Sequence, residues 1–343
     1  MRKKSIKIID KTLVTLSELY KDKISTNLSE ITELCNILSN MGTDCLEVSQ
    51  EILYLALPTL VGKNKHLILK NQMDEKEFRD FKLKVYEVNR FTHNKTVERD
   101  LHIEIEIEDA RNIDSLKDIS VLKENVSGFT IRGLDNVMLY DYKETFSKLT
   151  EFFRADLNLC PSDKYGLASA TALEWLNFGG ASISTSFSGA GNLCPLEEFL
   201  AARRFILKDS FQGDLTLLPK AVKIVEKISS LNIPKGKPII GKGIFDFESG
   251  IHADGIFKNP ETYEPYSPQK IGSERNLIIG KHSGASALRR KLMLLNADYN
   301  EEILPAVLDE IRAASTEKER SLSDSEILDI CDSVRRRMPW TRY

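Results

Sequence analysis

The chain has 343 residues, with 48 Lys and Arg against 51 Asp and Glu, so its formal net charge is −3. This nearly neutral balance gives no electrostatic reason to expect nucleic acid or an anionic membrane as a partner. No apolar run reaches the roughly 18 residues that a membrane-spanning helix needs. The five cysteines are widely spaced and form no CxxC pair. That pattern favours a reducing cytoplasm and argues against a disulfide framework or a cysteine zinc site.

The first two thirds of the chain alternate short β-like runs with amphipathic helical patterns. Eight runs are predicted strands: Lys7–Asp10, Cys45–Val48, His66–Leu69, Lys84–Val88, Ile103–Ile107, Phe129–Arg132, Leu157–Cys160 and Ile183–Phe187. The strict alternation of Ile and Glu over 103–107 indicates a strand with one dry face, whereas 84–88 could instead continue a charged helix. Eight strands with intervening helices predict an α/β fold, a parallel closed (β/α)₈ TIM barrel, with a doubly wound open sheet as the alternative.

Composition divides the chain into three parts. The barrel is expected over residues 1–231, and a connector over 232–249, because residues 232–238 are rich in Pro, Gly and Lys and lack any period. Residues 250–343 are expected to form a C-terminal lid and a small helical subdomain. Its helical patterns lie at about 283–295, 300–314 and 323–337.

The densest chemical signal lies in two Gly-rich segments, FESGIHADG at 247–255 and GKHSG at 280–284. Glycines on either side of His252 permit a tight backbone there, and a histidine transfers protons near neutral pH. Tyr263, eleven residues further on, can donate a hydrogen bond to a developing oxyanion. Lys281 and His282 precede a predicted helix, where they could cap it or contact an anion, and their role is left open. The alternative is that these loop residues only form hydrogen bonds with nearby backbone groups and have no catalytic role.

The run ESGIHADGIFKNPETYEPY, followed by IGKHSGASAL, resembles the C-terminal lid of homocitrate and isopropylmalate synthases. These metal-dependent enzymes condense an acyl-CoA with a 2-oxo acid on a (β/α)₈ barrel. The resemblance implies that His252 and Tyr263 are catalytic and reach the active site of the neighbouring barrel in a dimer. Shorter matches elsewhere in the chain are IIDKTL, EDAR, YGLASATAL and PLEEF.

The barrel half departs from the family where its chemistry needs specific side chains. The family's DTTLRDGEQ supplies a catalytic Arg and a metal-binding Asp, and here Val14 and Thr15 stand at those positions. The family's HGHNDLGLA supplies two metal-binding His, replaced here by Cys160 and Ser162. The resemblance therefore implies a degenerate catalytic site with no metal ligands and no assigned substrate-binding residue in this chain. Asn192 lies one residue away from a further family position, so its role stays open.

Two hypotheses of different classes follow. In the first, the chain is a cytoplasmic subunit of a split homocitrate synthase, inactive alone, that completes the active site of a catalytic barrel subunit. Such two-gene enzymes occur in nitrogen-fixing bacteria with alpha and omega subunits, and this sequence resembles the omega type. The resemblance then implies acetyl-CoA and 2-oxoglutarate at a shared site and a divalent Mg, Mn or Zn ion on the partner. It also implies assembly as a heterodimer or heterotetramer, or as a homodimer when the chain is expressed alone.

The length after the second motif bears on the substrate, because only 59 residues follow Gly284. This is too few for the regulatory domain of the leucine-pathway enzyme, which favours the homocitrate type. The second hypothesis is a non-catalytic regulatory or binding paralogue that senses acetyl-CoA or an oxo acid. A self-sufficient condensing enzyme with a rebuilt site is a third possibility, and the missing ligands argue against it.

Overall fold

The computed structural model describes residues 6–60, 65–92, 96–123, 126–153, 157–248, 255–256 and 258–338, without the side chains of 96–98 and 117–123. The chain divides into two compact units, Met1–Ile240 and Gly241–Tyr343. Their border falls inside the segment expected as a connector, 232–249. Among the described helices, none is both long and apolar enough to cross a bilayer.

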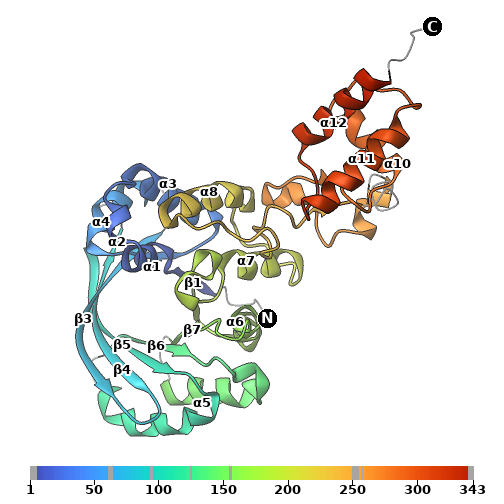
Figure 1. Ribbon diagram of the computed structural model, residues 1–343. Helices are drawn as coiled ribbons and strands as arrows, with labels where there is room; N and C mark the ends of the chain where they lie inside the picture. Colours follow the sequence, from blue (N-terminus) through green and yellow to red (C-terminus); the bar gives the residue numbers. More distant parts are fainter. Residues whose placement is uncertain are drawn as a thin grey trace. The chain divides into compact units, whose positions relative to one another are not determined.

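The first unit is a closed eight-stranded barrel in which each strand pairs with the next and β8 closes on β1 (Figure 1). All eight predicted strands are present, so the barrel prediction is confirmed. Their bounds are β1 Lys7–Asp10, β2 Cys45–Glu47, β3 His66–Glu77, β4 Lys82–Phe91, β5 Thr96–Ile107, β6 Gly128–Gly133, β7 Leu157–Pro161 and β8 Ser182–Thr185.

The prediction of an all-parallel barrel is wrong for β4, which runs antiparallel to both β3 and β5. The three strands form a long meander in place of two strand–helix–strand crossovers. The reason lies in the connections: residues 78–81 join β3 to β4, and residues 92–95 join β4 to β5. Such short links suit hairpins, whereas a parallel crossover needs a dozen or more residues.

Helices cover the remaining strands. They are α1 Thr12–Leu19, α2 Lys21–Ile24, α3 Leu28–Met41, α4 Gln50–Ala56, α5 Tyr142–Phe153, α6 Ala168–Phe178, α7 Leu196–Phe205 and α8 Leu218–Ser229. Short 3₁₀ segments are η1 Leu57–Leu60, η2 Ala110–Lys123, η3 Val137–Leu139, η4 Phe187–Asn192 and η5 Leu215–Leu217. Gly42 and Gly179 end α3 and α6 in the left-handed conformation that glycine tolerates best.

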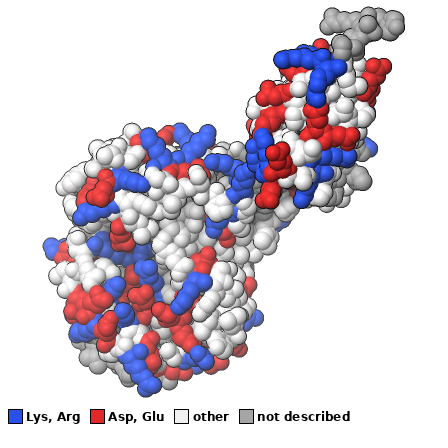
Figure 2. All heavy atoms as spheres, viewed as in Figure 1, with Lys and Arg blue, Asp and Glu red and all other residues white. Residues whose placement is uncertain are grey.

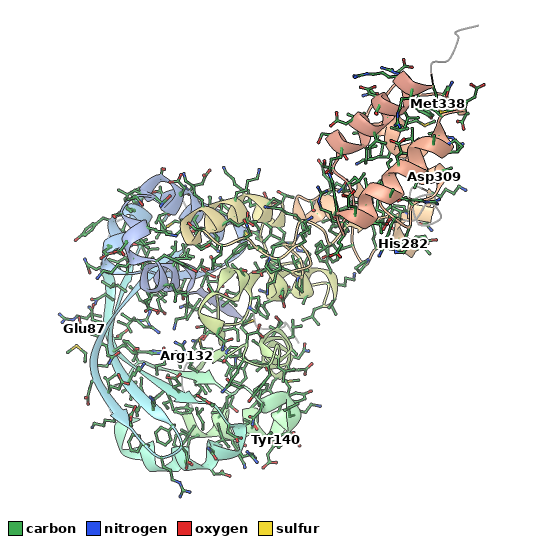
Figure 3. The ribbon with its side chains drawn as sticks, in the orientation of Figure 1. Glu87, Arg132, Tyr140, His282, Asp309 and Met338 are labelled. Atoms are coloured by element: carbon green, nitrogen blue, oxygen red, sulfur yellow. The ribbon has the colours of Figure 1, made fainter. Side chains whose placement is uncertain are left out.

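Polar side chains fill much of the barrel interior, where parallel barrels usually carry branched apolar residues. Glu104 of β5 points inward, because its carboxylate contacts Lys11 at the end of β1 and Arg132 of β6. Ile103 and Ile105 must then face outward, since side chains alternate along a strand. Figure 3 shows Arg132 on the barrel side and Glu87 on the other side of the β3–β5 sheet.

In its described part, the second unit has a small sheet followed by three longer helices. β9 Asp246–Phe247 pairs in parallel with β10 Asn276–Leu277, and the short segments η6 Pro260–Thr262 and η7 Pro268–Ile271 lie between them in sequence. The helices are α10 Ala285–Leu294, α11 Leu304–Glu317 and α12 Asp324–Arg337. They bury an apolar cluster that includes Leu288, Val307 and Ile327. Acidic and basic side chains alternate over the visible face of this unit (Figure 2).

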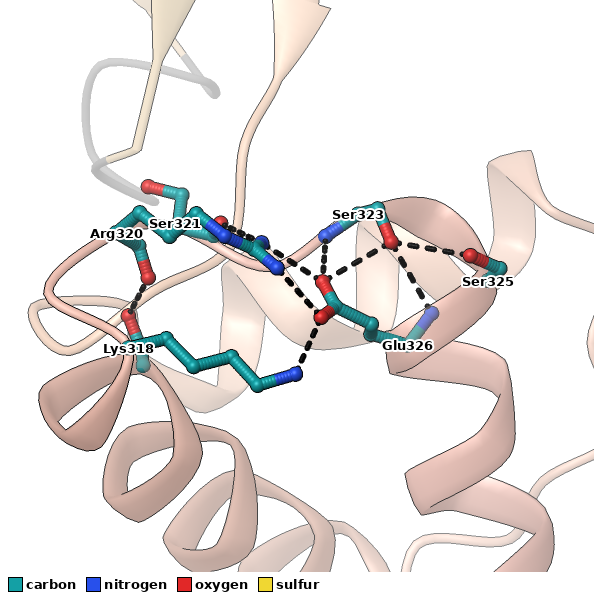
Figure 4. A network of polar contacts seen from close by, with 7 residues as sticks. Lys318, Arg320, Ser321, Ser323, Ser325 and Glu326 are labelled. Carbon is teal, nitrogen blue, oxygen red and sulfur yellow. Dashed lines mark hydrogen bonds and ion pairs between the residues drawn. The ribbon is translucent and has the colours of Figure 1, made fainter.

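A capping box fixes the start of α12 (Figure 4). The Ser323 hydroxyl accepts from the backbone N–H of Glu326, and the Glu326 carboxylate accepts from the backbone N–H of Ser323. Lys318 and Arg320 also pair with Glu326. Two otherwise orphaned helix donors are thereby satisfied, so the last helix begins where its sequence signal places it.

Candidate active site

The positions at which the resemblance implies that metal ligands are missing come together at the carboxyl end of the barrel. Thr15 lies in α1 just after β1, Ser162 follows β7, and Asn192 ends η4 after β8. The Asn192 side-chain amide donates to the Ser162 hydroxyl at 3.0 Å. Gly191 lies so close to Thr15 that a Cβ on this glycine would be 2.8 Å from the Thr15 methyl. Asn192, which sequence spacing could not assign, therefore belongs to this site.

The donor atoms at this site do not suit a divalent metal ion. Cys160 is fully buried in β7, and burial raises the pKa of its thiol, which stays neutral. Thr15 and Ser162 offer only neutral hydroxyls, where such an ion prefers carboxylates and imidazoles. Among the residues that the structure describes, no three His, Cys, Asp or Glu side chains converge on one point. No chemical step is therefore assigned to a metal ion held by this barrel.

Five charged side chains occupy the barrel mouth instead. The Lys11 ammonium lies 3.7 Å from both Glu47 and Glu104, and the Lys70 ammonium lies 3.1 Å from Glu47 and 3.4 Å from Glu104. Arg132 adds a 3.8 Å contact to Glu104. Burial by itself would raise the pKa of Glu104, but the three surrounding cations outweigh it and hold that pKa well below its usual range. Glu104 is thus ionised, and its counter-charges come from within the protein.

A hydrogen-bonded layer crosses the barrel interior below these charges. The Asn158 amide donates to the hydroxyls of Thr130 and Ser184, and Thr130 also contacts His102 Nε2 at 2.8 Å. Burial lowers the pKa of His102 to about 3, so the ring is uncharged at neutral pH. His102 is therefore a neutral hydrogen-bonding residue of the barrel interior and does not add a cation to the site.

The two lid motifs leave the small sheet side by side, because β9 and β10 are parallel neighbours. Glu248, the residue after β9, accepts from the backbone N–H of His282 at 2.9 Å and from the Ser283 hydroxyl at 3.3 Å. The side chains of Lys281 and His282 are exposed, and Figure 3 marks His282. The Glu248 carboxylate therefore ties the start of the first motif to the turn of the second.

Tyr263 follows η6 and is 46% exposed. Its ring lies against the backbone of Gly255, where a Cβ would come within 2.5 Å of the phenol oxygen. The next residue, Glu264, makes a two-pronged ion pair with Arg275 at 2.6 and 2.7 Å, which anchors this stretch to the rest of the unit. The predicted catalytic residue His252 lies outside the described residues, so its placement stays a prediction.

Two buried carboxyls near the barrel mouth predict an unusual pH dependence of stability. Asp10 accepts from the backbone N–H of Thr12 and the Thr185 hydroxyl, and Glu197 accepts from the backbone N–H of Ser188. Burial raises the pKa of each carboxyl to about 7. Between about pH 4 and pH 7 the folded chain keeps protons that the unfolded chain has released, so stability falls as pH rises through this window.

We expect the melting temperature to be several degrees lower at pH 8 than at pH 5.5, since each retained proton is worth about 1–3 kcal/mol. The double variant Asp10→Asn, Glu197→Gln should flatten this dependence, because neutral amides replace both carboxyls. Thermal unfolding followed by circular dichroism at the two pH values measures the difference. A double variant with the same pH dependence as the parent chain would contradict this assignment.

Comparison with known proteins extends over both units. A family model described as "Homocitrate synthase post-HMGL domain-like" matches residues 239–319. The omega subunit of homocitrate synthase from Clostridium pasteurianum is 30% identical over 335 residues, which cover 94% of each chain. Homocitrate synthase 1 from a Nostoc species is 32% identical over 247 residues, which cover 70% of this chain and 66% of that protein.

Proposed function

Since the chain belongs to the homocitrate synthase family, we propose that it is the lid-bearing subunit of a split homocitrate synthase. The observation that carries the proposal is a contrast within the chain. The barrel mouth presents Thr15, Cys160 and Ser162 where a metal site needs carboxylate and imidazole, while the lid keeps the His252 and Tyr263 pattern. A chain of this kind can support catalysis only with a second barrel that carries the missing groups.

The relative that matches almost the whole chain is itself named an omega subunit, which supports this assignment. The chemistry of the barrel supports it as well. Its mouth holds lysines that are paired with carboxylates of the same barrel, and its buried thiol is neutral, so these groups do not offer the metal ion that would polarise an oxo acid. The partner that the proposal requires is a catalytic barrel of the same family.

In the proposed reaction, acetyl-CoA, 2-oxoglutarate and water give homocitrate and CoA. A base removes a proton from the acetyl methyl group, the resulting carbon nucleophile attacks the oxo carbon, and water then cleaves the thioester. The divalent ion on the partner would stabilise negative charge on the oxo acid. From this chain, His252 would take part in the proton transfer, and the Tyr263 hydroxyl would donate a hydrogen bond to it or to the developing oxyanion.

A non-catalytic regulatory paralogue is the second candidate function. The ion pairs within the barrel mouth are equally compatible with that role, because a regulatory protein needs only to retain the fold. The lid separates the two candidates, because a purely structural chain has no need for both a histidine and a tyrosine at this spacing. Activity in the presence of a catalytic barrel is therefore the deciding measurement.

We expect the isolated chain to release no CoA from acetyl-CoA in the presence of 2-oxoglutarate, and to bind no stoichiometric Mg²⁺, Mn²⁺ or Zn²⁺. Activity should appear when a metal-loaded barrel of the family that lacks its own lid is added. Thiol release and elemental analysis of the purified chain measure the two expectations. Turnover by the isolated chain that a chelator abolishes would overturn the proposal.

A further inference from the structure

We infer that the barrel carries a second ligand site, a cavity at its amino end that binds a small zwitterion of the α-amino acid class. The described residues leave an open cavity of about 870 Å³ there, a size typical of small-molecule sites. Its lining includes the starts of three neighbouring strands, since Lys7 opens β1, Asp44 precedes β2 and Lys65 precedes β3. The candidate active site lies at the carboxyl ends of the strands, so the two sites are separate, and the inference does not depend on the role of the lid.

The strand side of the cavity is held in place by backbone hydrogen bonds. The Oδ2 atom of Asp44 accepts from the backbone N–H of Ile8 at 2.8 Å, and the backbone N–H of Asp44 donates to the Ile8 carbonyl at 2.9 Å. The Lys65 ammonium donates to the Thr43 carbonyl, which uses one of its three protons. The Lys7 side chain is exposed. A carboxylate oxygen of Asp44 and both ammonium groups are therefore available to a ligand.

The opposite side is formed by the end of α3 and the loop that follows α7. A Cβ on Gly42 would lie 2.9 Å from the Phe211 ring, so the loop packs directly against the helix end. The Arg203 guanidinium bonds Asp209 at 2.9 and 2.6 Å and lies 4.6 Å from the centroid of the Phe211 ring. Asp214 completes the lining. These contacts fix the wall before any ligand arrives, and a preorganised wall lowers the entropic cost of binding.

Charges of both signs line the cavity without neutralising one another. Within the part of the chain that the structure describes, no ion pair joins Lys7 or Lys65 to a carboxylate, and none joins Asp44 or Asp214 to a cation. Arg203 is already balanced by Asp209. A ligand with a single charge would meet like charges as well as opposite ones. A zwitterion pairs with both, its carboxylate with the lysines and its ammonium with the aspartates.

Thermal unfolding of the full chain tests the ligand class, with each standard L-α-amino acid added at about 10 mM. We expect at least one of them to raise the melting temperature by about 2 °C or more, because a ligand that binds only the folded state stabilises it. The N-acetyl and carboxamide derivatives of that amino acid each lack one of the two charges. They should leave the melting temperature where it is without ligand.

Two cavity variants and one control locate the binding, measured by isothermal titration calorimetry. Lys7→Gln and Asp44→Asn should each weaken it by about tenfold, because each removes one charge-assisted contact. Asparagine keeps an oxygen for the Ile8 N–H, so the strand ends should stay in place. Lys223→Gln, at an exposed position of α8 outside the lining, should bind as the parent chain does.

The inference is overturned if no amino acid shifts the melting temperature of the parent chain, or if the N-acetyl or carboxamide derivative binds as well as the free amino acid. Binding that both cavity variants retain at full strength would also overturn it, since the ligand would then lie elsewhere. Lys7 is exposed, so Lys7→Gln keeps the test decisive even if Asp44→Asn does not fold.

Discussion

Replacing His252 with alanine is expected to lower the turnover of the reconstituted two-chain enzyme by about 10²–10⁴-fold, the usual contribution of a general acid or base. The reason is that His252 would supply the proton transfer that the partner barrel lacks. Substitution of one histidine in this Gly-rich segment is expected to remove little packing, so the variant should fold and bind its partner as the parent chain does. CoA release by the mixed subunits at saturating substrate measures the effect.

Two comparisons show whether the loss of turnover in His252→Ala comes from a lost catalytic group or from altered structure. Tyr263→Phe keeps the ring against Gly255 and removes only the hydroxyl, so we expect a smaller loss, about 10- to 10³-fold. The metal content of the partner should be the same with either variant, because neither residue lies in the partner's barrel. If both variants support the same turnover as the parent chain, the lid has only a structural role. The regulatory function would then be the better candidate.

The sequence predicted the barrel because strand patterns are local. All eight runs of β-forming residues became strands. The direction of β4 was missed, since direction depends on the length of a connection and not on the alternation within a strand.

The site was predictable where it depended on residue identity and unpredictable where it depended on side-chain direction. The losses at Thr15, Cys160 and Ser162 could be seen in the sequence alone. The alternation over 103–107 indicated one dry face, but nothing in it showed that the glutamates would face the barrel interior. The ion pairs of Lys11 and Lys70 with Glu104 could therefore not be predicted, because Glu104 lies on a strand that is distant in the sequence.

Gly255→Ala is the second variant for which we expect a large effect, because it moves Tyr263 without removing its hydroxyl. The added Cβ would lie 2.5 Å from the phenol oxygen and 2.5 Å from a ring carbon, so the ring must shift. Since the ring is nearly half exposed, it can move into solvent and the fold should survive. A hydrogen-bond donor displaced by about 1 Å loses much of its catalytic value, and we expect about a 10²-fold loss of turnover in the reconstituted enzyme.

The matched control is Gly236→Ala, where a Cβ meets nothing within 4 Å and turnover should stay at the parent level. The double variant Gly255→Ala, Tyr263→Phe gives the sharpest result. If the glycine acts only by placing the tyrosine hydroxyl, adding the second change should cost little beyond the first, because residues that act as a unit are not additive. Two full and independent losses would instead mean that Gly255 shapes the path of the His252 segment itself, and that Tyr263 is a separate contributor to the reaction.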